Sequence, residues 1–282
     1  MPIPQFLLTY KAKLSKLRRK LLYYTSKNTE GYRRLSLWIP ELAMYKTDTL
    51  EFLADTAKKK GFSDLSSYAD HLEDHPSDLE ALRTNLTFLG THFFRGNDWD
   101  FFDKNCLASF QNASDVRVWC AGCSSGKEVY SLIMLLHQYV PLESIHVLAT
   151  DYNDKMLEDT KNGVYYNMHL AEIPEALQKR FLTIREKKFT FNDDIREIID
   201  TKNLNLLTDS YPTGFDIILC RNVLKFFDPP VITEVHKKLV PSLNPGGYLF
   251  VSTDDGDDLE TVKDPVALGL EQIGDRSIYR KF

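Results

Sequence analysis

The chain has 282 residues, 43% of them apolar and 27% charged, which indicates an ordinary soluble core in one large domain or two smaller ones. No apolar run approaches the roughly 18 residues of a membrane span, and the N-terminus lacks the charge order and cleavage site of a secretory signal. Two of the four cysteines fall in a glycine-rich segment, which argues against a disulfide framework. We therefore expect a cytoplasmic protein without membrane insertion.

The net charge of −5 is unevenly distributed along the chain. Residues 1–40 contain nine Lys or Arg and one acid, Glu30, a net charge of +8, so the other 242 residues sum to −13. A basic segment on an acidic protein favours a partner with negative charge. A solvated helix face explains the same pattern equally well.

Residues 1–90 are expected to form a small helical domain with a linker. Three leucines between residues 14 and 21 recur at helical spacing, with Lys and Arg between them. Residues 50–60 and 66–72 are also typical of short helices, and residues 74–77 of a loop.

From residue 115 onward, expected strands alternate with expected helices. The strands are expected at residues 116–119, 145–149, 215–220, 248–252 and 277–282. Helices are expected at 129–136, after Asn153 and at 231–240, and Pro245-Gly246-Gly247 is expected to form a turn. This alternation predicts a doubly wound parallel α/β sheet in a domain of residues 91–282. Residues 181–205 interrupt the alternation, and a small antiparallel β insertion is expected there.

The segment VWCAGCSSGKEVYS, residues 118–131, runs from an expected strand through a glycine-containing turn into a helix. Small residues let the backbone approach a ligand closely, and the helix N-terminus offers free N–H groups. The spacing Gly122-x-x-x-Gly126 differs from the G-x-G-x-x-G of dinucleotide sites, so a pyrophosphate cradle is disfavoured. The simpler alternative is that these residues form an ordinary tight turn between a strand and a helix and bind no ligand.

Polar residues follow two other expected strands. Asp151 ends the second strand. In sheets of this kind a carboxylate at that point accepts hydrogen bonds from the two ribose hydroxyls of a bound nucleotide-type ligand. The alternative is that Asp151 caps the following helix. Arg221 and Asn222 follow the buried strand 215–220 at the sheet edge where substrates bind, and they too have a capping alternative. The seven His and four Cys show no metal-ligand spacing, so no metal site is expected.

Seven segments occur in the order seen in the chemotaxis-receptor methyltransferases, the CheR family. They are THFFR (91–95), AGCSSGKEVYS (121–131), ATDYN (149–153), GVY (163–165), NLL (205–207), CRNVLKFF (220–227) and LNPGGYLF (243–250). The chain thus resembles a diverged member of that family over about residues 80–252. The resemblance implies a Rossmann-like class I methyltransferase fold, with a small all-helical N-terminal domain and a short β insertion that docks on receptors.

The resemblance also implies the reaction and the site. The donor would be S-adenosyl-L-methionine, the demethylated product S-adenosyl-L-homocysteine, and the other product glutamyl methyl esters on cytoplasmic helices of chemotaxis receptors. Glu128 would pair with the amino group or ribose region of the cofactor, Asp151 would hold the ribose, and Asn205 and Leu206 would line the adenine. The implied cofactor-binding residues are Thr91, Arg95, Gly122, Glu128, Asp151, Asn205, Leu206, Arg221 and Asn222.

The sequence departs from the family pattern at several points. Lys127 replaces the first Glu of the family's G-E-E-P-Y-S. Two departures bear on activity: Phe226 replaces a Tyr assigned to the active site, and Val251-Ser252-Thr253-Asp254 stand where the family has a Gly-His-Ser-Glu segment. Arg95 and Phe226 are therefore the candidates for a catalytic role, Arg95 by orienting a carboxylate.

Two other functions stay open: a non-catalytic, cofactor-binding signalling protein, and an RNA methyltransferase that uses the basic N-terminus. The pI of about 5.8 and the absence of an Asn-Pro-Pro-Tyr motif disfavour nucleic acid.

Overall fold

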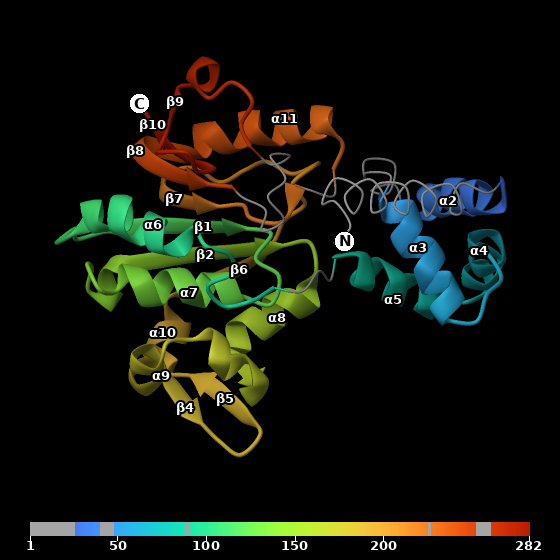
Figure 1. Cartoon of the computed structure of the whole chain (residues 1–282), viewed down its shortest axis with the longest axis horizontal. Coiled ribbons are helices and arrows are strands. Elements are labelled where there is room, and N and C mark those ends of the chain that lie inside the picture. The colour runs from blue at the N-terminus through green and yellow to red at the C-terminus, as the bar shows by residue number, and fades with distance from the viewer. Residues whose placement is uncertain (1–25, 40–47, 88–90, 225–226, 252–260) are drawn as a thin grey trace, which may run out of the picture. The chain divides into compact units, whose positions relative to one another are not determined.

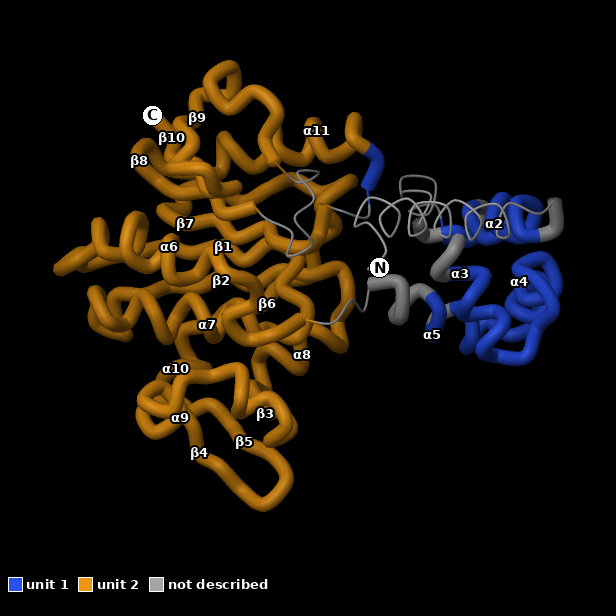
Figure 2. The backbone as a smooth tube through the Cα atoms, viewed as in Figure 1, with its two compact units in different colours: residues 1–85, 226–228 blue, residues 86–225, 229–282 orange. Residues whose placement is uncertain are grey.

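The computed structural model describes residues 26–39, 48–87, 91–224, 227–251 and 261–282. The chain divides into two compact units (Figures 1 and 2), residues 1–85 with 226–228 and residues 86–225 with 229–282. The first unit ends close to the predicted boundary between residues 90 and 91. The helix predicted over residues 14–21 lies outside the described residues.

The described part of the first unit is helical, as predicted. Its helices are α2 (Ser26–Trp38), α3 (Asp48–Lys59), α4 (Leu65–Asp74) and α5 (Pro76–Thr87). Asp64 caps α4, because its carboxylate accepts the backbone N–H of Ser67 at 2.9 Å. The loop predicted at residues 74–77 is wrong in extent. Only His75 separates the two helices, since Pro76 occupies the first position of α5, where no N–H is needed.

Two basic residues of the segment 1–40 are engaged within this unit. Arg33 pairs with Glu30 at 2.9 Å, one turn away on α2. Arg34 pairs with Asp70 and, at 2.7 Å, with Glu73 of α4. Both guanidinium groups are thus balanced locally and add little to an attraction for a partner.

The second unit contains a seven-stranded sheet in the order β6-β2-β1-β7-β8-β10-β9. Its strands are β1 (Val116–Ala121), β2 (Ile145–Asp151), β6 (Ile199–Asn203), β7 (Phe215–Leu219), β8 (Leu243–Phe250), β9 (Leu270–Gln272) and β10 (Ile278–Lys281). The first five in this order pair in parallel, and β10 runs antiparallel to both of its neighbours. Because the chain order reverses between β1 and β7, the expected doubly wound, Rossmann-like sheet is confirmed.

Helices cover both faces of this sheet. The helices of this unit are α6 (Trp99–Asn105), α7 (Lys127–Leu136), α8 (Asp154–Asn162), α9 (Glu175–Phe181), α10 (Asp193–Glu197) and α11 (Pro229–Leu239), with the 3₁₀ helix η4 (Asn167–Glu172). The connections through α7 and α8 run one way along the sheet and the connection through α11 runs the other way. Since such crossovers are right-handed, α7 and α8 lie on one face and α11 on the opposite face (Figure 1).

The predicted turn at 245–247 is wrong, because these residues lie inside β8. Gly246 has φ +79°, and the pairing of β7 with β8 shifts register between Phe215 and Ile217. The glycines therefore form an irregularity within the strand, a place where strands tolerate them.

A second, three-stranded antiparallel sheet has the order β3-β5-β4 and lies at the end of the unit away from β8–β10 (Figure 1). Its strands are β3 (Val164–Tyr166), β4 (Leu182–Ile184) and β5 (Lys188–Phe191). The predicted insertion at 181–205 thus needs a correction at both ends. It misses β3, and it includes β6, which belongs to the large sheet because it pairs with β2 from Val147 to Asp151.

Aromatic side chains join the small sheet to the rest of the unit. Tyr130 of α7 stacks on Phe191 of β5 with ring centroids 3.9 Å apart. Phe93 meets the edge of Tyr165 in β3 at 5.1 Å. All four rings are buried in the main hydrophobic core, so the small sheet is held against α7 and the segment 91–95.

The four cysteines are free thiols and all are buried, which confirms that no disulfide framework supports the fold. Burial raises the pKa of Cys106 to about 12 and that of Cys120 further, as expected for packing residues. Among the described residues, no helix has the length and apolar character to cross a membrane.

Candidate active site

Four of the parallel strands end next to one another, and each is followed by predicted site residues. Gly122 follows β1, Asp151 ends β2, Asn205 comes two residues after β6, and Arg221 two residues after β7. The strand order β6-β2-β1-β7 places these ends side by side. The site predicted from the sequence therefore lies along the carboxyl edge of the sheet, around its point of reversal.

The turn after β1 depends on Gly122. Its φ is +77°, and its N–H and that of Cys123 both donate to the Thr150 carbonyl at 2.8 Å. A Cβ atom there would lie 2.5 Å from Cγ2 of Val223, in the loop after β7. The glycine thus lets the loops after β1 and β7 approach each other closely.

Replacing Gly122 by alanine is expected to lower the free energy of unfolding by about 2 kcal/mol, from backbone strain and overlap with Val223. Gly269→Ala is the matched control, since Gly269 has φ +75° but a Cβ atom added there would meet no other atom within 4 Å. Denaturant unfolding should show a smaller loss for the control. Equal losses would show that the contact with Val223 costs nothing.

Asp151 binds the backbone around it. Its Oδ2 accepts the N–H of Ser124 at 2.8 Å, and its Oδ1 accepts the N–H of Asn153 at 3.0 Å. Its side chain is largely buried, and this burial raises its pKa, against the lowering by N–H groups of Asn153, Ser124 and Tyr152. Asp151 therefore fixes the glycine-rich turn to the start of α8, and its carboxylate retains acceptor positions for a ligand.

Glu128 and Arg221 form a buried ion pair between the first turn of α7 and the loop after β7. Their side chains are 16% and 1% exposed. Burial raises the pKa of Glu128, and the charges of Arg221, Arg95 and His92 oppose that rise. The pair brings together two residues that are 93 positions apart in the sequence.

The guanidinium of Arg221 has further contacts. It donates to the backbone carbonyl of Arg95 at 2.9 Å, and its Cζ lies 4.5 Å from the ring centroid of Phe250 and 5.2 Å from that of Trp99. Arg221 thus connects Glu128 with the segment 91–95 from within a partly aromatic environment.

The segment 91–95 is fixed by two residues of the segment 121–131, Lys127 and Ser131, and by Glu172, which no motif indicated. Lys127 donates to the Thr91 carbonyl at 3.0 Å, and the N–H of Phe94 donates to Oγ of Ser131 at 2.9 Å. The N–H of Phe93 donates to Glu172 at 2.8 Å. Lys127, which departs from the family pattern, is therefore an anchor for the backbone of this segment.

The glycine-rich turn has a second anchor that sequence reasoning missed. Tyr165, in the GVY segment, donates from its hydroxyl to the Ser125 carbonyl at 2.5 Å. Thr160 of α8 donates to the Ser124 carbonyl at 2.9 Å. The position of GVY among the seven segments was the only sequence signal for the tyrosine.

The remaining predicted residues lie in two loops. Asn205 closes a turn, because its side chain accepts the N–H of Leu207 at 2.9 Å and its N–H donates to Asp209 at 2.9 Å. Leu206 is buried in the same turn. Asn222 is buried beside Arg221 with φ +58°, a conformation that asparagine tolerates better than most residues. Phe226 lies outside the described residues.

Comparisons with known proteins match the same part of the chain. A family model described as "CheR methyltransferase, SAM binding domain" matches residues 90–265. A chemotaxis protein methyltransferase of Listeria monocytogenes is 32% identical over 240 residues, which cover 83% of this chain and 88% of that protein. One of Borreliella burgdorferi is 27% identical over 71% of this chain and 76% of its own length. One of Escherichia coli is 30% identical over 78% of this chain and 82% of its own length.

Proposed function

Because the chain belongs to the family of CheR methyltransferases, we propose that it transfers a methyl group from S-adenosylmethionine to glutamate side chains of chemotaxis-receptor-like proteins. The observation that carries this proposal is the meeting of the glycine-rich turn, Asp151, Glu128 and Arg221 along one edge of the sheet. This edge is where ligands bind in doubly wound folds.

The residues present fit the cofactor. Asp151 is a largely buried carboxylate with acceptor positions left over for two ribose hydroxyls. Gly122 leaves the backbone after β1 without a side chain, and Glu128 offers a negative charge to an ammonium group. Asn205 and Leu206 would flank the adenine, and the segment from Thr91 to Arg95 would face the methionine end.

The chain's task in this reaction is alignment and charge placement. When bound, the cofactor supplies an electrophilic methyl group on a positively charged sulfur. A glutamate carboxylate, with an ordinary pKa of about 4.3, is already ionised at neutral pH and needs no general base. Transfer of the methyl group from sulfur to a carboxylate oxygen would leave S-adenosylhomocysteine and would require no proton transfer, so the residues of the chain would have to align the two reactants only. Arg95 is the residue we assign to orienting a carboxylate.

The decisive experiment uses the full chain with isotopically labelled S-adenosylmethionine and lysate of a chemotactic bacterium. A glutamyl methyl ester releases methanol in alkali, whereas a methylated amine is stable, so alkali-labile label on protein supports the proposal. Alkali-stable label on RNA would favour the RNA methyltransferase instead. Cofactor binding without labelled product would favour the signalling protein.

Phe226 bears on the turnover rate of methyl transfer. Where the family has a tyrosine at this position, Phe226 keeps the ring and lacks one hydroxyl. Restoring it in Phe226→Tyr should leave cofactor affinity within about threefold and raise turnover by about 2- to 10-fold, the rate equivalent of one ordinary hydrogen bond. Calorimetry and alkaline methanol release measure the two quantities. A Tyr variant no faster than the native chain would deny this position a part in the alignment.

We also propose cytoplasmic receptor helices as the partner. Four free, buried thiols support a reducing compartment. The net charge of +8 over residues 1–40 supports attraction to an acidic helix bundle, although Arg33 and Arg34 are balanced within their own unit. Salt should therefore weaken the association.

A further inference from the structure

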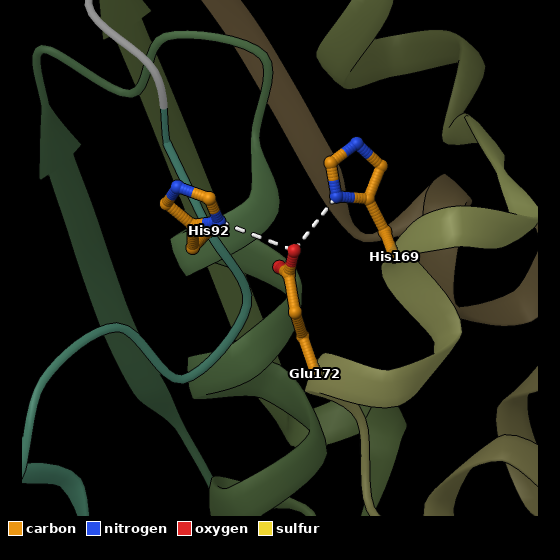
Figure 3. A group of neighbouring side chains, drawn as sticks. All are labelled: His92, His169 and Glu172. Carbon is orange, nitrogen blue, oxygen red and sulfur yellow. Dashed lines mark hydrogen bonds and ion pairs between the residues drawn. The ribbon is translucent and has the colours of Figure 1, made fainter.

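Three side chains that no sequence motif groups together meet where the segment 91–95 passes η4. One of them belongs to the segment and the other two belong to η4. Figure 3 shows His92, His169 and Glu172 with their polar ends turned toward one another. Nδ1 of His169 lies 2.8 Å from Oε1 of Glu172, and Nδ1 of His92 lies 3.1 Å from the same oxygen. One potential ligand atom from each residue lies within 4.8 Å of the other two. This grouping of two histidines and a glutamate was not visible in the spacing of the sequence.

We infer that these residues bind a divalent transition-metal ion of the Zn²⁺ class, through Nδ1 of His92, Nδ1 of His169 and Oε1 of Glu172. Around tetrahedral zinc, ligand atoms stand about 3.3 Å apart, since each metal bond is about 2.0–2.1 Å long. The two nitrogen–oxygen separations of 3.1 and 2.8 Å need to open by a few tenths of an ångström, and the two nitrogens, which lie within 4.8 Å of each other, need to close by at most about 1.5 Å. The ion replaces the hydrogens that the imidazoles donate to the carboxylate.

Two ligands are oriented in advance by the fold. His169 and Glu172 stand three residues apart on η4, which places both on one side of that turn. The N–H of Phe93 donates to Oε2 of Glu172 at 2.8 Å, so this oxygen is occupied and Oε1 faces the histidines. A carboxylate held in this way is typical of metal ligands, whose geometry is fixed by outer hydrogen bonds.

The site is accessible from solvent. The side chain of His92 is 54% exposed, and those of His169 and Glu172 are 19% and 23% exposed. Three protein ligands with an exposed side leave room for water as a fourth ligand. Two imidazoles and one carboxylate favour zinc, copper or nickel over magnesium and calcium, which prefer oxygen ligands.

One nearby charge opposes the ion. Nζ of Lys127 lies 3.2 Å from Nε2 and 3.5 Å from Nδ1 of His169, and it also donates to the Thr91 carbonyl. A cation held at Nδ1 would be repelled by this ammonium group. Lys127 therefore limits the affinity of the site without occupying a ligand position.

A bound ion would connect two segments of the same unit. His92 belongs to the segment that carries Thr91 and Arg95, whereas His169 and Glu172 belong to η4, 77 to 80 residues later. The metal thus acts as a cross-link between the segment 91–95 and η4. Because neither Asp151 nor Glu128 is one of the ligands, metal binding does not require cofactor.

The test is titration of the tag-free, chelator-treated full chain with Zn²⁺ by calorimetry, without cofactor, and with Co²⁺ followed by visible absorption. We expect one ion per chain, with the visible bands of a low-symmetry cobalt site. His169→Asn and Glu172→Gln should each weaken Zn²⁺ binding by about 100-fold or more. Mg²⁺ should not compete at equal concentration.

His146→Gln is the matched control, because His146 is also exposed and lies 3.5 Å from a carboxylate, that of Asp115, with no third ligand among the residues that the structure describes. It should bind Zn²⁺ as the native chain does. The inference is overturned if the native chain does not bind Zn²⁺, or if Glu172→Gln and His146→Gln bind it equally. Circular dichroism of each variant shows that it is folded.

Lys127 provides an independent check. Lys127→Gln removes the opposing charge and keeps an amide donor for the Thr91 carbonyl, so its Zn²⁺ affinity should rise by about 10-fold. An affinity equal to or below that of the native chain would contradict a cation held beside His169. Neither metal experiment depends on methyl transfer, so failure here leaves the proposed function unaffected.

Discussion

Replacing Arg221 by methionine is expected to reduce the free energy of unfolding by about 3–5 kcal/mol, which corresponds to a fall of about 10 °C in melting temperature for a unit of this size. Arg221 is 1% exposed and its partner Glu128 is 16% exposed. Methionine retains much of the packing against Phe250 and Trp99. The loss therefore arises because the buried Glu128 must either stay ionised without its main countercharge or take up a proton, and both cost free energy.

A double-mutant cycle isolates this effect. Glu128→Gln in the Arg221→Met background removes the stranded charge and should recover more than about 1 kcal/mol of the loss. Arg276→Met is the matched control, because Arg276 also pairs with a carboxylate, that of Asp98 at 2.9 Å, but is 40% exposed. The control should lose less than about 1 kcal/mol. A control as unstable as Arg221→Met would mean that burial does not set the strength of these pairs.

The large sheet was predictable because burial on both faces leaves a simple signal. Residues 215–220 are a nearly continuous apolar run, interrupted by Asp216, and β7 is found there, paired on both sides. The edge strand β6 lacks that signal. Its sequence Ile-Asp-Thr-Lys-Asn is polar because one edge and much of one face meet solvent, so the strand was assigned to the insertion.

The positions of the site residues were predictable for a different reason. Parallel strands align their carboxyl ends, so polar residues that follow apolar runs must meet at one edge of the sheet. That rule predicts the position of Asp151 and Arg221 at this edge, and both lie there. It does not predict the groups that contact them, because it gives a place in the sheet and says nothing about side-chain contacts. The pairing of Arg221 with Glu128 crosses 93 residues.

Contacts around η4 had no sequence signal at all. Residues 167–172 form a 3₁₀ helix of six residues, too short for a periodic pattern. Glu172 meets Phe93 across 79 residues, and the meeting depends on how the small sheet packs against α7. Only a three-dimensional structure brings these residues together.

Asp151→Ala is expected to weaken the binding of S-adenosylmethionine by about 100-fold, since two ribose hydroxyls would lose an ionised acceptor worth about 3 kcal/mol in total. The structure adds a second consequence. The carboxylate also accepts the N–H groups of Ser124 and Asn153, so alanine releases the glycine-rich turn as well. Calorimetry on this variant alone therefore cannot separate a lost ligand contact from a loosened turn.

Asp151→Asn separates the two in large part, because its amide oxygen still accepts the N–H of Ser124, whereas the bond to the N–H of Asn153 and the charge are lost. We expect it to keep most of the stability of the native chain and to bind cofactor about 10-fold more weakly. Asp154→Asn is the control, since Asp154 lies three residues further on, is exposed and accepts only from Asn203, at 2.7 Å, among the contacts described. Its cofactor affinity should match that of the native chain.

The pH dependence of cofactor affinity gives the sharpest distinction between a lost contact with the ribose and a loosened turn. Burial raises the pKa of Asp151, so the native carboxylate gains its proton at a higher pH than an ordinary aspartate as the solution is acidified. As the pH is lowered, the cofactor affinity of the native chain should therefore begin to fall at a pH above that at which an ordinary aspartate is protonated. Asp151→Asn has no carboxylate to protonate, so its affinity should not fall over that pH interval. Parallel pH profiles for the two proteins would show that Asp151 holds the turn but not the ribose.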